Sequence, residues 1–304
     1  MSISNNCQGS SGCADIYATV ARNQPACERY WQILLRLPKQ AQALYAHFTP
    51  GQFVLLDLRN LGVPDEVPSD LVHKADRSVI LRRPFSPMQV QCGPDGVEIE
   101  LLYKVVGPAT IRMTSLRPGQ SLRLLGPLGK GFRIGPAIKI AILVAGGIGL
   151  PPIHHLSYIL KRDRPTVRLE VFIGAKTAND LPFLGPDGRP TRMQGMPIHL
   201  TSEDGSIGTK GLVTECLLDW LAGQTDLDPG TTVICGCGPA AMLTRLARIA
   251  MDKGLSCQIS LESYMACGIG LCQGCVVPCK GKDGPDYRLC CQDGPVFDAG
   301  QVDI

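Results

Sequence analysis

Apolar residues follow two different patterns along the chain, and the change lies near residue 135. Before it, short runs of alternating apolar residues are separated by turn dipeptides such as Pro50-Gly51. The runs are 31–37, 52–58, 79–85, 97–106 and 120–126. This pattern predicts an antiparallel β-barrel over residues 17–135. The polar, proline-containing stretch 59–77 is expected to be an inserted surface loop.

After residue 135, apolar strands alternate with amphipathic helices. Strands are expected at 139–147, 167–176, 197–203 and 231–238, and helices at 151–162, 211–223 and 239–254. Such alternation predicts an α/β domain, residues 136–254, with a parallel sheet covered by helices on both faces. Residues 255–304 are expected to form a small unit rich in cysteine and glycine, and residues 1–16 a flexible tail.

Composition narrows the class of protein. The chain has 304 residues, of which 44% are hydrophobic and 19% charged, so it can form two domains and is not disordered. A net charge of +3 gives no sign of a nucleic-acid polycation. The N-terminus lacks the basic start and apolar core of a signal peptide, and the apolar runs are too interrupted to span a bilayer. We therefore expect a cytoplasmic protein without membrane insertion.

Half of the 14 cysteines lie beyond residue 254. The segment 267-CGIGLCQGC-275 places Cys267, Cys272 and Cys275 in C-x4-C-x2-C spacing, and Cys290 and Cys291 follow. This spacing is the plant-type pattern for a [2Fe–2S] cluster. The alternative is a zinc site with four thiolates, although zinc sites usually pair two short knuckles.

Two details of this cysteine loop can be predicted from its residue types. Gly268, Gly270 and Gly274 allow positive φ and carry no side chain, so backbone N–H groups are expected to approach the sulfurs. Cys290 and Cys291 are adjacent, and adjacent side chains of extended backbone point to opposite sides. At most one of the pair can therefore face the cluster, and Cys279, which lies nearby, is a further candidate for the fourth ligand.

Three further segments have the residue types of cofactor sites. In 82-RRPFS-86, an arginine and a serine three residues later can bind a pyrophosphate while Phe85 packs on a flavin ring. Two strands run into glycine-rich turns before helices, at 143-LVAGGIGLPP-152 and 235-CGCGPAAM-242, and together they predict a dinucleotide crevice. The five histidines have no catalytic or ligand spacing, and we predict no catalytic side chain; His154 and His155 are expected on the surface of a helix or packed against it.

In this order, the predicted barrel, dinucleotide domain and cysteine unit resemble the ferredoxin–NADP reductase superfamily. The segments 262-ESYMACGIGLCQGCVVP-278 and 293-DGPVF-297 are most similar to the electron-transfer subunits of class B dihydroorotate dehydrogenase. The resemblance implies that FAD is bound by Arg83, Pro84, Phe85, Ser86, Leu102, Tyr103, Lys104, Ala109 and Thr110. It implies that NAD is bound by Gly146, Gly147, Ile148, Gly149, Cys237, Gly238 and Pro239. It also implies that the fourth cluster ligand is Cys291, two residues before the DGPVF aspartate.

The function implied by the resemblance is electron transfer. A separate FMN-containing catalytic subunit would oxidise dihydroorotate, and its electrons would pass through the [2Fe–2S] cluster and FAD to NAD+, in a heterotetramer of two subunits of each kind. Glu203 and Asp204 would disfavour the 2′-phosphate of NADP, although Lys176 lies nearby. The alternatives are a diaphorase subunit serving a hydrogenase or ferredoxin partner, and a non-enzymatic zinc-stabilised scaffold or redox sensor.

Overall fold

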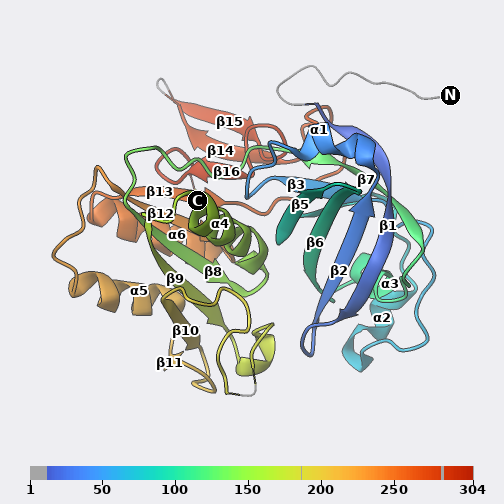
Figure 1. Cartoon of the computed structure of the whole chain (residues 1–304), viewed down its shortest axis with the longest axis horizontal. Coiled ribbons are helices and arrows are strands. Elements are labelled where there is room, and N and C mark those ends of the chain that lie inside the picture. Colours follow the sequence, from blue (N-terminus) through green and yellow to red (C-terminus); the bar gives the residue numbers. More distant parts are fainter. Residues whose placement is uncertain (1–11, 186, 282–283, 304) are drawn as a thin grey trace.

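The computed structural model describes residues 12–185, 187–281 and 284–303, in which a curled antiparallel sheet lies beside a helix-covered parallel sheet (Figure 1). The strands of the curled sheet are β1 (Ala14–Pro25), β2 (Tyr30–Leu37), β3 (Phe53–Leu56), β4 (Arg83–Phe85), β5 (Gln89–Gly93), β6 (Gly96–Lys104) and β7 (Ser121–Leu128). They are hydrogen-bonded in the order β4-β3-β7-β1-β2-β6-β5, and each pair is antiparallel. The predicted antiparallel barrel is confirmed in this half-closed form.

Some residues outside the predicted strands are also structured. β1 begins at Ala14, whereas the predicted tail runs to residue 16, and residues 1–11 lie outside the described residues. The stretch 59–77 was expected to be a loop, but it contains two short helices because Leu71 and Ala75 are buried against the curled sheet. The short helices of this half are η1 (Lys39–Ala41), α1 (Gln42–Tyr45), η2 (Ser69–Leu71), α2 (Val72–Ala75) and α3 (Pro108–Met113).

The second sheet is parallel except at one edge. Its strands are β8 (Ile140–Gly146), β9 (Arg168–Ala175), β10 (Ile198–Ser202), β11 (Thr209–Lys210), β12 (Thr232–Cys237), β13 (Ser256–Ser260) and β16 (Val296–Asp298), in the order β11-β10-β9-β8-β12-β13-β16. Only β16 among them pairs in the antiparallel sense. Its helices are η3 (Gly147–Gly149), α4 (Leu150–Asp163), η4 (Ala178–Asp180), α5 (Val213–Ala222) and α6 (Ala240–Asp252).

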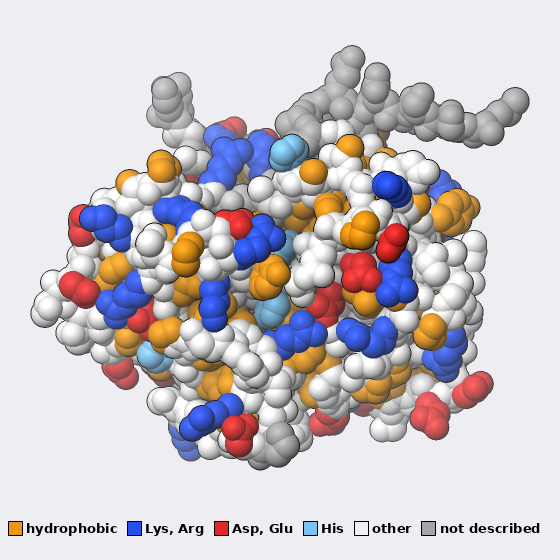
Figure 2. Space-filling model, viewed as in Figure 1, with side chains coloured by type: hydrophobic (Ala, Val, Ile, Leu, Met, Phe, Trp, Pro, Cys, Tyr) orange, Lys and Arg blue, Asp and Glu red, His pale blue; other side chains and the backbone are white. Residues whose placement is uncertain are grey.

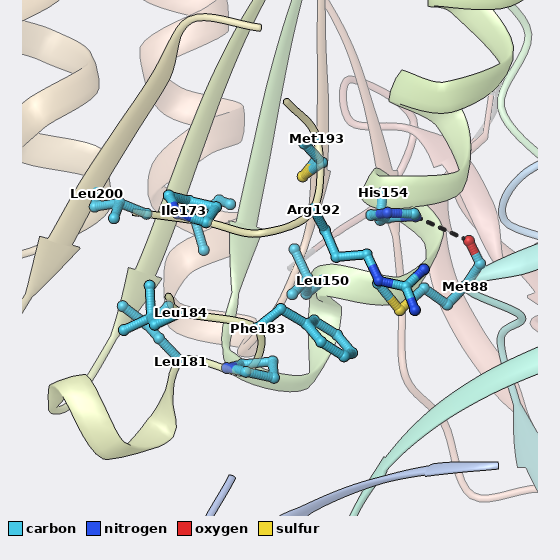
Figure 3. Close-up of a pocket in the computed structure, with 12 residues that line it drawn as sticks. Met88, Leu150, His154, Ile173, Leu181, Phe183, Leu184, Arg192, Met193 and Leu200 are labelled. Carbon is cyan, nitrogen blue, oxygen red and sulfur yellow. Dashed lines mark hydrogen bonds between the residues drawn. The ribbon is translucent and has the colours of Figure 1, made fainter. Parts of the chain in front are cut away.

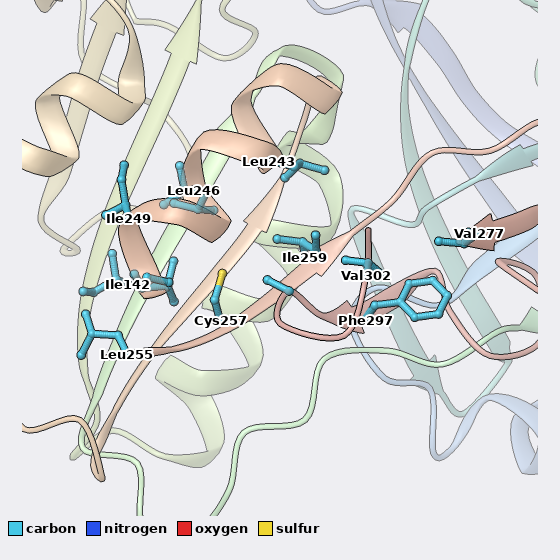
Figure 4. Packing of buried hydrophobic residues seen from close by; sticks show 14 of the residues in the cluster. Ile142, Leu243, Leu246, Ile249, Leu255, Cys257, Ile259, Val277, Phe297 and Val302 are labelled. Carbon is cyan, nitrogen blue, oxygen red and sulfur yellow. The ribbon is translucent and has the colours of Figure 1, made fainter. Parts of the chain in front are cut away.

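Helices cover both faces of this sheet, as the sequence predicts. Alternate residues of a strand point to opposite faces. Ile142 of β8 accordingly packs with α5 and α6, whereas its neighbour Leu143 packs with α4. Figure 4 shows Leu246 and Ile249 of α6 in the same buried cluster as Ile142 of β8 and Ile259 of β13.

The cysteine-rich segment begins and ends in the second sheet. β13 pairs with β12, and β16 pairs with β13 after an excursion that contains the hairpin β14 (Val276–Lys280) and β15 (Pro285–Leu289). The predicted division at residue 254 stays a prediction.

No helix within the described ranges is long and apolar enough to cross a membrane. Figure 2 shows basic and acidic side chains interspersed over one face of the molecule.

Two histidines of α4 are buried against the curled sheet. The His154 Nδ1–H donates to the Met88 carbonyl oxygen over 3.1 Å, and the His155 ring stacks on Phe48 with centroids 5.6 Å apart. The expectation of packing histidines is therefore confirmed. Burial lowers the pKa of His154 to about 4 and that of His155 to about 3.

These histidines predict acid sensitivity. Both pKa values in the folded chain lie below the ordinary value of 6.5, so between pH 6.5 and about 4 the unfolded chain binds more protons. Stability is therefore lost as the pH falls through this window, by up to about 1.4 kcal/mol per pH unit for each histidine. His155→Leu should flatten the fall of the melting temperature between pH 7 and pH 4.5, and it breaks no hydrogen bond at Nδ1, which is unpartnered. The exposed control His47→Gln should behave as wild type; equal slopes in all three proteins would contradict the assignment.

Candidate functional site

A cleft of about 450 Å³ lies where the curled sheet, the second sheet and the cysteine-rich segment meet. Nine of the predicted cofactor residues line it: Pro84, Phe85, Ser86, Leu102, Tyr103, Lys104, Thr110, Ile148 and Cys237. Its wall is largely apolar with a few hydroxyl and charged groups, which is the usual character of a site for an aromatic cofactor.

The other predicted cofactor residues do not line this cleft. They are Arg83, Ala109, Gly146, Gly147, Gly149, Gly238 and Pro239. The Arg83 guanidinium donates to the carbonyl oxygens of Leu81 and Arg82, at 2.8 and 3.3 Å, so the structure does not bring it beside Ser86 in the cleft. Their assignment as ligands stays a prediction.

The two glycine-rich strand exits lie side by side. β8 and β12 are parallel neighbours, with β9 and β10 beyond β8 and with β13 beyond β12. The order of strands along the chain thus reverses between β8 and β12, and in open α/β sheets ligands bind at the carboxyl ends of strands at such a point. The helices α4 and α6 begin just after these exits. The two exits are therefore adjacent, as predicted, and their role as a dinucleotide site stays a prediction.

Glycine is needed here for backbone packing. A Cβ added at Gly149 would lie 2.1 Å from the Cys237 carbonyl oxygen, and one added at Gly146 would lie 2.7 Å from the Met242 sulfur. Neither distance is possible for a real side chain. The glycines therefore let the two strand exits touch, which fixes the floor of the crevice.

Part of the cleft wall was not predicted from the sequence. Ser260, Glu262 and Met265 line it, together with Phe53, Val106, Pro151, Pro152, Leu261, Ser263 and Pro295. A signal for Glu262 existed, because it opens the segment 262–278 that carries the resemblance, but no residue of that segment before Cys267 was given a role. Burial raises the pKa of Glu262, and burial with Glu262 nearby raises the pKa of Cys237 to about 12. The Cys237 thiol is therefore protonated at neutral pH.

The cysteine loop aims backbone N–H groups at sulfur. Cys267 Sγ accepts from Ile269 and Cys272 over 3.5 and 3.4 Å, and Cys272 Sγ accepts from Gly274 over 3.5 Å. Burial alone would raise the pKa of Cys267, but these donors outweigh it and lower the pKa to about 7. The predicted approach of N–H groups to the sulfurs is confirmed, and such donors stabilise thiolate charge.

Two of the three glycines of this loop use their freedom to adopt positive φ. Gly268 and Gly270 have φ values of 70° and 83°. Near Gly274 the positive φ lies one residue earlier, at Gln273 with 57°. The turn between Cys272 and Cys275 therefore places its left-handed residue next to the glycine rather than on it.

The four predicted ligands lie as two pairs of sulfurs. The Cys267 thiol contacts that of Cys272, and the Cys291 thiol contacts that of Cys275. Two thiolates for each iron is the donor set of a [2Fe–2S] cluster with four cysteines, so the residues present fit that group. In the part of the chain that the structure describes, no three His, Cys, Asp or Glu side chains converge as they would around one metal ion.

Of the adjacent pair, Cys291 faces the other three ligands. Its N–H donates to Cys275 Sγ over 3.4 Å, and its own Sγ accepts from Gly270 over 3.2 Å. The Cys290 thiol points the other way, to the Leu261 carbonyl oxygen at 3.7 Å, and burial raises its pKa to about 12. This geometry supports Cys291 as the fourth ligand.

The cleft and the cysteine loop are continuous. Met265 lines the cleft two residues before Cys267. A Cβ at Gly268 would lie 2.4 Å from Leu55 Cδ1, so the loop packs directly on β3, whose Phe53 also lines the cleft. A group in the cleft and a cluster on the four cysteines would therefore be near neighbours.

The two adjacent cysteines allow a direct test of the ligand set. Cys291→Ser should lose the cluster, because a neutral hydroxyl replaces a thiolate ligand, whereas Cys290→Ser should keep it. Both variants should retain flavin, because neither side chain lines the cleft. Iron and sulfide analysis with the visible absorption spectrum measures the outcome; wild-type iron in Cys291→Ser would show that the wrong sulfur was chosen.

Comparison with known proteins agrees with this site. Residues 262–303 match the model of the iron–sulfur cluster binding domain of dihydroorotate dehydrogenase B. One solved structure similar to this chain is the NADH-dependent reduced ferredoxin-NADP oxidoreductase of flavin-based electron bifurcation, with 22% identity, a TM-score of 0.71 and coverage of 94% of this chain and 89% of that one. Another is a ferredoxin reductase in carbazole 1,9a-dioxygenase, with 20% identity, a TM-score of 0.59 and coverage of 81% and 68%. These two likenesses show the fold.

Curated relatives cover most of the chain. The dihydroorotate dehydrogenase B (NAD(+)) electron transfer subunit of Caldanaerobacter subterraneus subsp. tengcongensis is 32% identical over 83% of this chain and 86% of its own length. The subunit of the same name from Fusobacterium nucleatum subsp. nucleatum is 34% identical over 84% and 87%. The chain therefore belongs to the family of electron transfer subunits of NAD(+)-dependent dihydroorotate dehydrogenase B.

Proposed function

We propose that this chain carries electrons from a dihydroorotate-oxidising catalytic subunit, through a [2Fe–2S] cluster and FAD, to NAD+. The observation that carries the proposal is the continuity of the cleft with the cysteine loop: Met265 lines the one and Cys267 belongs to the other. The cleft also adjoins the strand exits of β8 and β12, where a dinucleotide is expected. Three redox groups can thus be neighbours in one molecule.

FAD fits the cleft by its lining. The wall offers Phe85 as a flat apolar surface, and Ser86, Thr110 and Lys104 as polar groups. When bound, a flavin exchanges hydride with a nicotinamide and single electrons with an iron–sulfur cluster. The side chains of this chain bind and orient it.

NAD rather than NADP is favoured by two carboxylates at the end of β10. Asp204 accepts from the backbone N–H and the hydroxyl of Ser206, over 3.0 and 2.6 Å, and these bonds hold its pKa below the usual range. Glu203 beside it is also exposed. Two negative charges here repel the 2′-phosphate of NADP, whereas a free 2′-hydroxyl can donate to a carboxylate.

Cys267, Cys272, Cys275 and Cys291 hold the cluster. Four thiolates and two sulfides on two ferric irons leave a charge of roughly −2, and one more negative charge is added on reduction. The N–H groups of Ile269, Gly270 and Gly274 donate to these sulfurs and lower the cost of that charge.

The partner is an FMN-containing dihydroorotate dehydrogenase catalytic subunit, in a heterotetramer of two subunits of each kind. The curated relatives are themselves named as subunits, which supports a permanent partner.

We place the protein in the cytoplasm. The four cluster cysteines must be available as thiolate ligands, and a reducing compartment keeps cysteines in that state.

Reconstitution with the catalytic subunit tests the proposal. The complex should form NADH from dihydroorotate and NAD+, and neither subunit alone should do so. Cys275→Ser should lower this rate by about a hundredfold or more, because electrons lose their path between the subunits, while NADH-driven reduction of ferricyanide through FAD is kept. NADH formation without this chain, or an undiminished rate in Cys275→Ser, would contradict the proposal.

A further inference from the structure

The segment between β9 and β10 extends from the second sheet to the curled sheet. Figure 3 shows Phe183, Arg192 and Met193 of this segment beside Met88 and His154. Such a connection needs only a few residues, yet this one contains η4 and a long loop. Nothing in the electron path described above accounts for it.

Arg192 of this segment forms a two-pronged ion pair with Glu100 of β6. Its Nη2 and Nη1 donate to the two carboxylate oxygens over 2.7 and 3.2 Å. The Glu100 side chain is only 7% exposed, and the Arg192 guanidinium also lies over the Phe183 ring, 4.9 Å from its centroid. Paired arginine and carboxylate groups in this geometry are among the strongest directional contacts in proteins.

A second ion pair joins the same two parts of the molecule. Lys104, at the end of β6, donates to Asp180 of η4 over 2.8 Å, and its ammonium lies 5.0 Å from the Tyr30 ring centroid. Two hydrogen bonds of the Met88 backbone also connect β6 to α4. The Met88 N–H donates to the Glu100 carbonyl oxygen, and the Met88 carbonyl oxygen accepts from His154 of α4.

The two ion pairs lie on either side of a cleft residue. Residues two apart on a strand share a face, so Glu100, Leu102 and Lys104 point together. Leu102 packs in the cluster that joins the curled sheet to the second sheet, whereas Leu101 points into the curled sheet. Leu102 and Lys104 also line the cleft.

The backbone of the segment is strained where it presents Arg192. Phe183 and Met193 have positive φ values of 66° and 61°, which are unfavourable for side chains of this size. Phe183 lies under the guanidinium, and Met193 follows Arg192 directly. Strain of this kind persists when the surrounding contacts require it and is concentrated at functional positions.

We propose that Arg192 and Asp180 are positioning residues that hold β6 against the second sheet and so set the spacing of flavin and nicotinamide for hydride exchange. The proposal rests on the proposed function. Hydride exchange depends steeply on the separation of its reacting atoms, and a misplacement of about 1 Å can lower a rate about a hundredfold. The two ion pairs link the strand that bears Leu102 and Lys104 to the sheet that bears Gly146 and Ile148.

Rapid-mixing measurement of FAD reduction by NADH, in the intact complex without oxygen, tests this role. Arg192→Gln should lower the limiting rate by about tenfold or more, while FAD and iron per chain stay at wild-type values and the half-saturating NADH concentration changes little. The control is Arg189→Gln in the same loop, whose side chain is 87% exposed and whose Nε lies 4.0 Å from Asp187; it should match wild type.

Further variants separate positioning from stability. In a double-mutant cycle, Arg192→Gln should add little to the loss caused by Glu100→Gln, because both remove the same contact. Glu100→Gln also weakens the pair with Arg22, whose guanidinium lies 3.9 Å from Glu100 Oε1. Arg192→Lys, which keeps the charge without the two-pronged geometry, should be intermediate. Arg192→Gln cannot be used for this test if it fails to retain FAD. In that case Asp180→Asn, which breaks the second and more exposed ion pair, takes its place. The same measurement should then give a lower limiting rate of FAD reduction than in wild type.

A lower melting temperature with an unchanged limiting rate would overturn the proposal, because the ion pair would then only stabilise the fold. Equal rates in Arg192→Gln and Arg189→Gln would do the same. A wild-type complex whose FAD is not reduced by NADH would instead contradict the proposed function, so the two failures are distinguishable.

Discussion

The pairing of β13 with β16 is the constraint on which the electron path depends. Ser260 and Val296 are partners in this ladder, and the whole cysteine-bearing segment leaves the second sheet after the first and returns before the second. Both ends of the segment are therefore held at the sheet that forms the dinucleotide crevice. The cleft wall and the cluster ligands therefore share one support.

The curled sheet is a separate element and needs contacts of its own to meet this frame. Near the cysteine loop, Lys130 donates its N–H to the Gly294 carbonyl oxygen, and Gly268 packs on Leu55. At the far side, Arg192 reaches Glu100 across the junction. Contacts at both ends of the junction limit how far the two halves can rock about the cleft.

Local patterns were sufficient for much of the fold and of the site. Alternating apolar residues predicted the curled sheet, and the strand and helix alternation predicted the second one. The spacing of Cys267, Cys272 and Cys275 is a property of one tight loop, so it could be recognised without any distant partner. The departures occurred where burial by distant residues decided the conformation, as at Leu71 and Ala75 in the stretch expected to be a loop.

The sequence by itself determined the chemistry: which cysteines can bind iron, which strand exits can face a phosphate, and the order of the three units. The tertiary structure alone decided how these parts are joined. It points the thiol of Cys291, the ligand that the resemblance implies, toward the other cysteines and that of Cys290 away from them. It also brings Glu262 into the cleft and pairs Arg192 with a buried carboxylate distant in the chain. The physical reason is that a motif is specified by neighbours along the chain, whereas contacts such as these depend on packing between segments far apart in sequence.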